Sequence, residues 1–249
     1  MSKQRTGFVC MVFLLLISFT SKAQFYLGIE AGGNKNYLIT NNSAQSFTTY
    51  NSASGISIGI PVLYQFNEWF ALQASPSYTQ KNYQINRTGF FQGIYQKNTN
   101  GYIQLPIMGN FSFGGEQLRG YANLGVYGAY WLSGNVKGTE PNILNPNDTA
   151  YSSSNPSTAL NENYGYSYNE KYTFSSIKDN RLELGWVAGM GISYEVNSSY
   201  RFFIEGKYTG SFTDQQKKYQ TNQVPRYNDT FGISIGCLFS LDNLFGSFY

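Results

Sequence analysis

The most constraining feature of this chain is a strict alternation of apolar residues with small or polar ones. In segment 54–66, for example, Ile56 and Ile58 lie on either side of Ser57, and the same period of two recurs in segment 228–240. Successive side chains of a strand point to opposite faces. Each such segment therefore predicts a β-strand with one apolar face and one small or polar face.

Eight segments fit this pattern, and the connections between them alternate between short and long. The expected strands are 25–38, 54–66, 69–80, 101–113, 118–133, 180–196, 200–212 and 228–240. The short connections are Asn67-Glu68, Gly114-Gly115-Glu116 and Asn197-Ser198-Ser199, and the long ones are 39–53, 81–100, 134–179 and 213–227. This alternation is typical of outer-membrane barrels. We predict an all-β fold, an eight-stranded antiparallel up-and-down transmembrane β-barrel with short periplasmic turns and long extracellular loops.

Two features depart from this regularity. Pro61, Pro76 and Pro106 lie inside expected strands, and proline cannot donate a hydrogen bond to a strand ladder. We expect each of them at a bulge or near a strand end. The connection 134–179 is dense in Asn, Ser, Tyr and Pro, and we expect it to be partly disordered, with a hairpin around 164–174.

The first residues have the three-part pattern of a secretory signal. Lys3 and Arg5 precede an apolar run of twelve residues, and a short polar stretch then ends at Ala23. The apolar run is shorter than the ~20 residues that a spanning helix needs, which disfavours the alternative of a retained anchor helix. We predict a signal peptide at 1–23, cleaved near Ala23, an outer-membrane β-barrel domain at 24–249, and a place in the bacterial outer membrane.

Composition excludes several classes of function. Removing the predicted signal takes away three of the 17 basic residues, so that 14 remain against 14 acidic ones. A neutral chain gives no reason to expect a nucleic-acid partner. Histidine is absent and only Cys237 follows the signal, so we expect no intramolecular disulfide, no thiolate metal site and no cofactor.

Two blocks of residues carry a resemblance to a known family. The first is Tyr102-Ile103-Gln104-Leu105-Pro106-Ile107 followed by 118–132, and the second is 179–194 followed by Ile204-Glu205-Gly206-Lys207-Tyr208. They resemble strand pairs of the small outer-membrane β-barrel domain family of Gram-negative bacteria, often labelled the porin family. The resemblance covers nearly the whole chain after residue 23 and implies fold and membrane placement, with little about activity. The family's strand proline falls at Pro106, whereas Lys207 stands where the family commonly has Arg.

The polar faces of the expected strands carry charged residues. The alternation places Glu30, Glu183, Glu205 and Lys207 on the faces that point away from lipid. On the lipid face, a Lys side chain at the bilayer midplane would destabilise the barrel by roughly 2–4 kcal/mol. We expect Lys207 to pair with one or more of the carboxylates. The full lumenal polar cluster that we predict is Glu30, Gln104, Tyr121, Asn123, Glu183, Glu205 and Lys207. Such a cluster is either a structural plug, which small barrels favour, or a proton or ion relay.

Two matches to an enzyme motif are explained by the alternating pattern of the expected strands. Segments 55–59 and 232–236 both match G-x-S-x-G, but that motif requires a strand-to-helix turn and a histidine base. We therefore predict no catalytic residues and no enzyme. A hydrolase that uses only the carboxylates of Glu183 and Glu205 is the remaining enzymatic hypothesis.

Aromatic residues gather beside the short turns and in the longest loop. Those beside the turns are Tyr64, Phe66, Trp69 and Phe70 at one turn and Tyr194, Tyr200, Phe202 and Phe203 at another. They are expected to form a girdle at the water–lipid boundary. In the loop, Tyr164, Tyr166 and Tyr168 are candidates for contact with a carbohydrate or aromatic ligand.

These observations rank the functional hypotheses. The first is a non-enzymatic outer-membrane barrel that serves as a scaffold for surface loops, with lipid, lipopolysaccharide and an envelope or extracellular protein as partners. The second is a narrow porin-like channel for small solutes. A soluble periplasmic β-barrel binder ranks below both.

Overall fold

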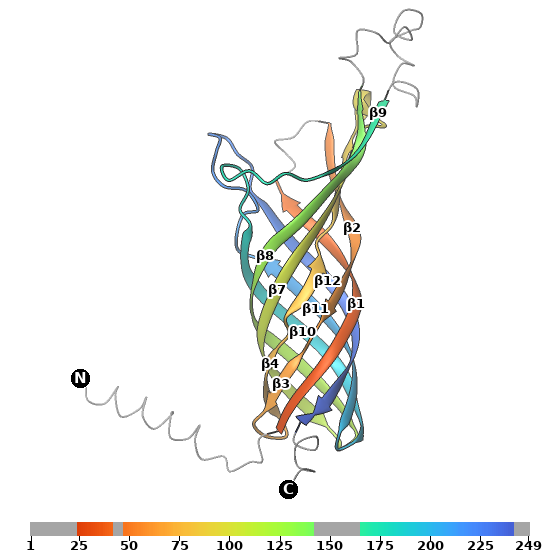
Figure 1. Cartoon of the computed structure of the whole chain (residues 1–249), viewed down its shortest axis with the longest axis vertical. Coiled ribbons are helices and arrows are strands. Elements are labelled where there is room, and N and C mark those ends of the chain that lie inside the picture. Colours follow the sequence, from red (N-terminus) through yellow and green to blue (C-terminus); the bar gives the residue numbers. More distant parts are fainter. Residues whose placement is uncertain (1–23, 42–46, 142–164, 242–249) are drawn as a thin grey trace, which may run out of the picture.

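The structure, a computed structural model, is one antiparallel sheet that closes on itself (Figure 1). It describes residues 24–41, 47–141 and 165–241. The predicted signal peptide, 1–23, lies outside these residues. Among the residues described, no helix is long and apolar enough to cross a lipid bilayer.

Within the described residues the sheet has twelve strands. They are β1 (Gln24–Thr40), β2 (Thr48–Gly59), β3 (Val62–Gln65), β4 (Phe70–Ala74), β5 (Ser77–Gln80), β6 (Tyr83–Arg87), β7 (Tyr95–Gly114), β8 (Leu118–Pro141), β9 (Gly165–Lys171), β10 (Leu182–Asn197), β11 (Tyr200–Ser211) and β12 (Arg226–Ser240). β2 and β3 follow one path, β4, β5 and β6 follow the next, and β9 lies outside the ring. The ring therefore has eight strand paths, which confirms the predicted number.

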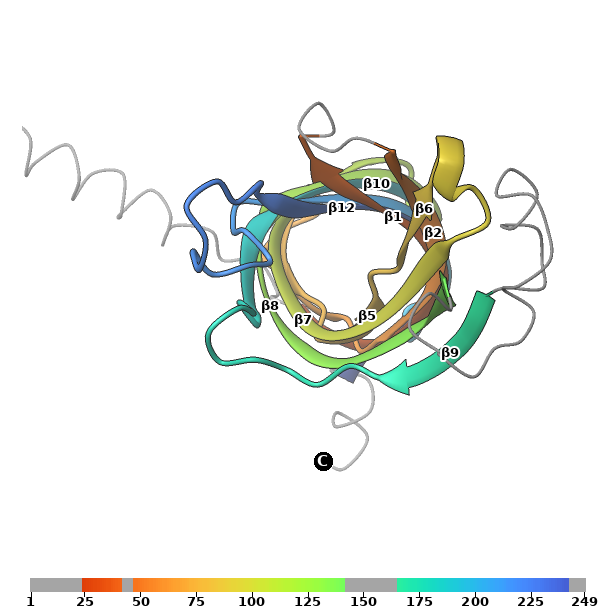
Figure 2. The ribbon, with the colours of Figure 1, turned by 90° about the horizontal axis from the view of Figure 1, so that it is seen from above.

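The ring closes between its first and last strands. β1 pairs with β12 from Tyr26 opposite Ser240 to Thr40 opposite Arg226. On its other side β1 pairs with β2 and β3, so that most of its length has a strand partner at both edges. Seen from above, the strands form a continuous ring (Figure 2).

The prolines interrupt neighbouring strands at adjoining positions. Pro61 lies between β2 and β3, and Pro76 lies between β4 and β5, as expected of residues near strand ends. Pro106 is different, because it lies inside β7 with the pairing to β8 continuous around it. The Pro106 nitrogen, which has no hydrogen to donate, faces the gap between β4 and β5. In this gap Ser75 N donates to Pro106 O at 3.2 Å. The expectation of a bulge or strand end at Pro106 was wrong. The neighbouring strand is interrupted there, so no backbone acceptor of that strand needs an N–H from Pro106.

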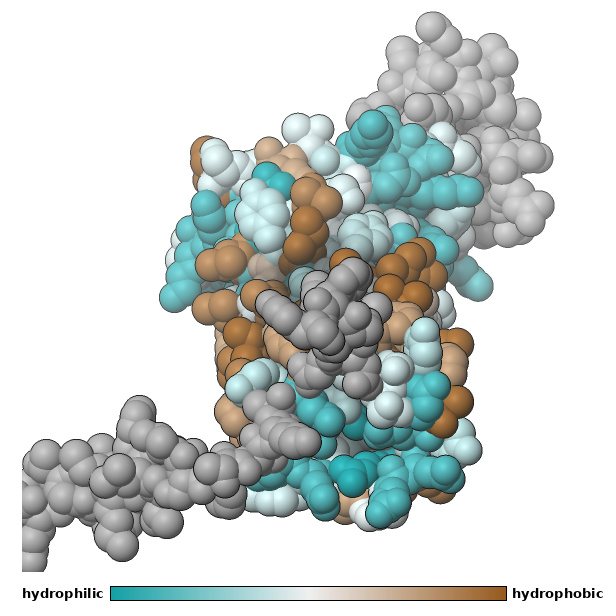
Figure 3. All heavy atoms as spheres, turned by 60° about the horizontal axis from the view of Figure 1, so that its bottom comes forward, coloured by the Kyte–Doolittle hydropathy of each residue, from teal (hydrophilic) through white to brown (hydrophobic). Residues whose placement is uncertain are grey.

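The exterior of the ring is apolar around its middle. Large apolar side chains on successive strands point outward and are exposed, among them Ile58, Leu105, Leu124, Ile192 and Ile235. Figure 3 shows such residues gathered on the middle of the visible face, with hydrophilic residues towards its ends. An apolar exterior of this extent, with polar side chains inside, is the inverse of a water-soluble barrel and suits lipid.

Three tight connections define what we call the short-turn end, formed by residues 66–69, 115–117 and 198–199. In two of them an asparagine closes the turn. Asn67 Oδ1 accepts from Phe70 N at 2.8 Å, and Asn197 Oδ1 accepts from Tyr200 N at 3.0 Å. The side chain thus takes the place of a backbone acceptor in each turn.

The aromatic girdle at the short-turn end has one member fewer than expected. Tyr64, Phe66, Trp69 and Phe70 form a connected set of ring contacts on the outside, and Tyr194, Tyr200 and Phe202 are also exposed. Phe203 was wrongly assigned to the girdle, because it is buried inside the ring. On β11 it shares the inward parity of Arg201 and Glu205.

The opposite, long-loop end extends well beyond the apolar band. β8 continues to Pro141 and pairs with β9, so that the segment expected to form a hairpin around 164–174 contains one strand, whose partner is the end of β8. β6 pairs with the first residues of β2 and with the start of β7. We call this projecting part of β2, β6, β7, β8 and β9 the extension (Figure 1). The predicted strands ended too early here, and residues 142–164 of the longest loop lie outside the described residues.

A charge on the outer wall tests whether that wall faces lipid. Ile235, 64 % exposed, lies on the outside of β12, and Ile235→Lys should lower the free energy of unfolding in lipid vesicles by about 2–4 kcal/mol. The matched control is Ile177→Lys, at an equally apolar and 71 % exposed residue outside the strands, which should change it by less than about 0.5 kcal/mol. Urea titration followed by the heat-dependent gel shift measures both, and equal effects would contradict a lipid-facing wall.

Candidate functional site

All seven residues of the predicted lumenal cluster point into the ring. Glu30, Gln104, Tyr121, Asn123, Glu183 and Glu205 are buried, and Lys207 is half-buried. The structure divides them into two groups instead of one. Lys207 does not pair with Glu183, because Glu183 is near the long-loop end of β10 and has a different cation.

The first group, which we call the Lys207 cluster, joins β1, β8 and β11. Lys207 Nζ donates to Glu30 Oε2 at 2.9 Å and lies 3.8 Å from Glu205 Oε1. The Tyr121 hydroxyl donates to Glu205 Oε2 at 3.2 Å, and Asn123 Nδ2 donates to Glu205 Oε1 at 3.1 Å. Glu205 is only 1 % exposed, and these donors replace the water that a buried carboxylate loses.

The second group, which we call the Lys81 cluster, joins the segment after β5 to β8, β10 and β12. Lys81 Nζ lies 2.5 Å from Glu183 Oε1. The Tyr127 hydroxyl donates to the same oxygen at 2.8 Å, and Asn228 Nδ2 donates to Glu183 Oε2 at 2.7 Å. The ammonium group also lies over the rings of Tyr127 and Tyr102, 4.6 Å and 5.2 Å from their centroids. Cation, anion and rings therefore satisfy one another across the lumen.

Glycines on β10 make room for the tyrosines of both clusters. Gly191 lies opposite Tyr121, and Gly185 lies opposite Tyr127. A Cβ on either glycine would lie 2.5 Å from the facing ring, so both rings need a partner without a side chain. Gly185 and Gly191 are therefore strand positions that let large lumenal side chains fit.

Two small cavities border the Lys207 cluster. A cavity of about 50 Å³ is lined by residues that include Glu30, Gln104 and Lys207, and a second of about 20 Å³ borders Tyr121 and Glu205. Gln104 thus lies beside the Lys207 cluster and makes no hydrogen bond through Oε1 within the described residues. Spaces of this size hold a few water molecules at most.

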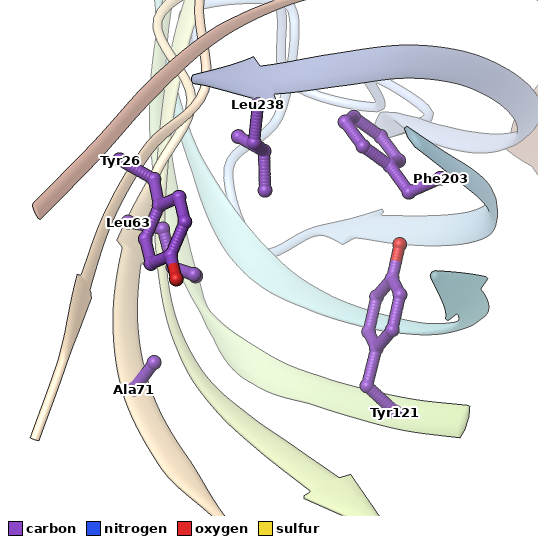
Figure 4. Packing of buried hydrophobic residues seen from close by; sticks show 6 residues of the cluster. All are labelled: Tyr26, Leu63, Ala71, Tyr121, Phe203 and Leu238. Atoms are coloured by element: carbon purple, nitrogen blue, oxygen red, sulfur yellow. The ribbon is translucent and has the colours of Figure 1, made fainter. Parts of the chain in front are cut away.

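Both ends of the lumen are closed by aromatic and apolar side chains. At the short-turn end Tyr26, Leu63, Ala71, Tyr121, Phe203 and Leu238 form a buried cluster (Figure 4). Beside it the Arg201 guanidinium pairs with Glu195 at 3.0 Å and covers the Tyr26 ring. Towards the long-loop end Trp131 stacks between Tyr102 and Tyr172, with ring centroids 6.0 Å and 5.2 Å away.

Two charged lumenal residues were missed in the sequence. Lys81 was assigned to a long loop, and Arg201 was not considered. Both could have been found by extending the parity of their strands, because Lys81 continues the inward series of Gln73 and Thr79, and Arg201 precedes Glu205 by four residues.

The three candidate loop tyrosines have different outcomes. Tyr164 lies outside the described residues, and of Tyr166 only the backbone, in β9, is described. Tyr168 is half-buried and lines a cleft in the extension. Partial burial, together with the carboxylates of Glu140 and Glu170, raises the pKa of the Tyr168 hydroxyl, so at neutral pH it remains a protonated donor.

Neither cluster has the composition of a metal site. Within residues 24–41, 47–141 and 165–241, no group of three or more His, Cys, Asp or Glu side chains is arranged to hold a metal ion.

An antiparallel ring of eight strand paths, apolar outside and polar inside, defines the class of small outer-membrane β-barrels. Residues 18–217 match the family model described as outer membrane protein beta-barrel domain, and the chain belongs to this family. Membership supports a place in the bacterial outer membrane. No curated protein matches the sequence.

Several solved structures are similar in fold. OprG from Pseudomonas aeruginosa is 15 % identical, with a TM-score of 0.47, and the match covers 88 % of this chain and 96 % of that one. Neisserial surface protein A is 12 % identical, with a TM-score of 0.41 over 86 % and 96 % of the two chains. Ail from Yersinia pestis, in complex with the heparin analogue sucrose octasulfate, is 14 % identical, with a TM-score of 0.40 over 87 % and 99 %.

The Lys81 cluster can be tested by removing one charge and then both. Lys81, whose side chain is 0 % exposed, is the cation of Glu183, and Lys81→Met should destabilise the barrel by about 3–5 kcal/mol because it leaves a buried carboxylate unpaired. Adding Glu183→Gln should recover part of that loss. Urea unfolding in vesicles completes the double-mutant cycle. Purely additive losses would show that the two side chains are not coupled.

Proposed function

We propose that this protein is a non-enzymatic outer-membrane barrel with a closed lumen, whose short-turn end faces the periplasm and whose extension contacts ligands outside the cell. The observation that carries the proposal is the filled interior. Two ion-pair clusters and two aromatic or apolar layers follow one another along the lumen, with cavities of about 50 and 20 Å³ between them. The stable ring then serves as a scaffold for the extension.

A filled lumen argues against the porin-like alternative. A barrel of eight strands is just wide enough for its own side chains, and here those side chains hold one another in place by charge. Lys207 on β11 reaches Glu30 on β1 past the intervening strand β12, and Lys81 reaches Glu183 on β10 past β7 and β8. A solute would have to break both buried ion pairs to pass.

The same contacts argue for structural carboxylates. Glu183 and Glu205 belong to separate clusters, and each accepts hydrogen bonds at both oxygens. A pair of hydrolytic carboxylates would have to flank one substrate bond. These two instead have their own cations and tyrosines, which supports a plug over a proton relay or a hydrolase.

Lipid and lipopolysaccharide are the partners that suit the outer wall. Towards the long-loop end the apolar band gives way to amphipathic groups. The Tyr208 hydroxyl donates to Asp229 at 2.8 Å beside the Trp186 ring, and Lys35 lies over Tyr37. Rings and charges at that level suit the headgroup region of a membrane. An envelope or extracellular protein remains a further candidate partner for the extension.

Permeability measurements test the closed lumen. Vesicles that contain the folded protein should swell in isotonic arabinose no faster than empty vesicles, because no continuous path crosses the two clusters. A general-diffusion porin in the same lipid is the positive control. Swelling that rises with the amount of protein would favour the narrow porin.

Cysteine labelling tests the orientation. In a Cys237→Ser background, Lys171→Cys places a thiol on exposed β9 and Glu116→Cys places one in an exposed short turn. On intact cells a membrane-impermeant maleimide should modify only the cysteine at position 171, and on disrupted cells it should modify both. The opposite pattern would reverse the proposed topology.

A further inference from the structure

The long-loop end of the molecule contains a wide cleft, lined mainly by residues of the extension. The cleft measures about 810 Å³, which is within the range of small-molecule sites. Its walls come from β2, β6, β7, β8 and β9, from the first residue of β12, and from residues just before β2 and between β6 and β7. The lining residues are Phe47, Thr48, Tyr50, Ile85, Arg87, Phe91, Ile94, Tyr95, Gln96, Thr139, Glu140, Tyr168 and Arg226. It lies beyond the apolar band, separate from the lumenal clusters.

Five aromatic rings border this cleft. Phe47 and Phe91 meet edge to face, with centroids 6.2 Å apart. On the neighbouring strands Tyr50, Tyr95 and Tyr168 combine a ring with a hydroxyl. Ring faces on the watery side of a membrane protein gain no stability from lipid, and grouped rings of this kind are typical of a binding surface.

The cleft is also cationic. It has the guanidinium groups of Arg87 and Arg226 against the single carboxylate of Glu140. Within the described residues neither arginine takes part in an ion pair. Arg87 Nη1 donates to Thr48 Oγ1 at 2.5 Å, and the Arg226 guanidinium lies 6.0 Å from the centre of the Tyr50 ring. Both cations are therefore positioned by neutral groups and retain donors for an anion.

We propose that this cleft binds an acidic saccharide, an inference that rests on the proposed external position of the extension and names its ligand class. Aromatic faces pack against the C–H faces of sugar rings, and guanidinium groups bind carboxylate or sulfate in two-pronged geometry. The hydroxyl group of Thr139, together with those of the tyrosines, suits a ligand with many hydroxyls.

Calorimetric titration of the detergent-solubilised protein tests the proposal with trigalacturonic acid and with maltotriose, a neutral sugar of equal length. Trigalacturonic acid should bind and maltotriose should bind at least roughly tenfold more weakly, since charge-assisted hydrogen bonds are lost. Arg226→Gln should weaken binding of the acidic sugar by roughly tenfold or more, whereas Glu140→Gln should strengthen it by up to about fivefold. Arg119→Gln, the same change at the short-turn end, should leave binding unaltered.

Equal binding of the two sugars, absence of binding, or equal effects of Arg226→Gln and Arg119→Gln would overturn the proposal. If vesicles that contain the protein still do not swell, the proposal of a closed lumen stands even though the saccharide proposal has failed. The two proposals can therefore fail separately. Competition with deacylated lipopolysaccharide core identifies the source of the saccharide. If the core displaces trigalacturonic acid, the natural ligand is a saccharide of the cell's own surface. If trigalacturonic acid stays bound, the natural ligand is a glycan from outside the cell.

Discussion

Pairing of the backbone with itself is the constraint on which the rest of this structure depends. Hydrocarbon offers no hydrogen bonds, so a strand that crosses it needs a partner at both edges. The contact of β1 with β12 supplies the last such partner. The same need for backbone pairing accounts for the positions of Pro61, Pro76 and Pro106. A proline has no N–H to donate, and these three residues lie next to one another, where strands of the sheet are interrupted.

Closure of a narrow ring determines what the interior can contain. Side chains from opposite walls must interlock, and polar faces turned away from lipid bring charges with them. The chain meets both demands at once, with the long side chain of Lys81 crossing to the Glu183 carboxylate and with glycines opposite the tyrosine rings. The interior of the ring is therefore held together by ion pairs and hydrogen bonds as well as by apolar contacts.

Residue alternation was sufficient to predict the eight strand paths of the ring and the inward placement of the charged residues, but not the pairing of β9 with the end of β8. It could not predict how the lumenal residues divide into clusters, because pairing across a ring depends on stagger between strands that are distant in sequence. Glu183 was grouped with Lys207 for that reason, although Lys81 is its partner. Phe203 was misplaced because nearness to a turn was given more weight than parity. The cleft in the extension could not be predicted from the sequence, because Arg87 and Arg226 are far apart in the chain and are brought to the same cleft only by the fold.

The pairing of the two terminal strands also determines the order of assembly. Of the strands that form the ring, β12 is the last in chain order, and until it is made neither β1 nor β11 has its second neighbour. No stable ring can form on a growing chain, because the contact that closes it joins residues more than 180 positions apart. The polypeptide must therefore travel to its membrane as an open chain with unpaired strand edges, exposed to aggregation, and become a folded protein in one late step.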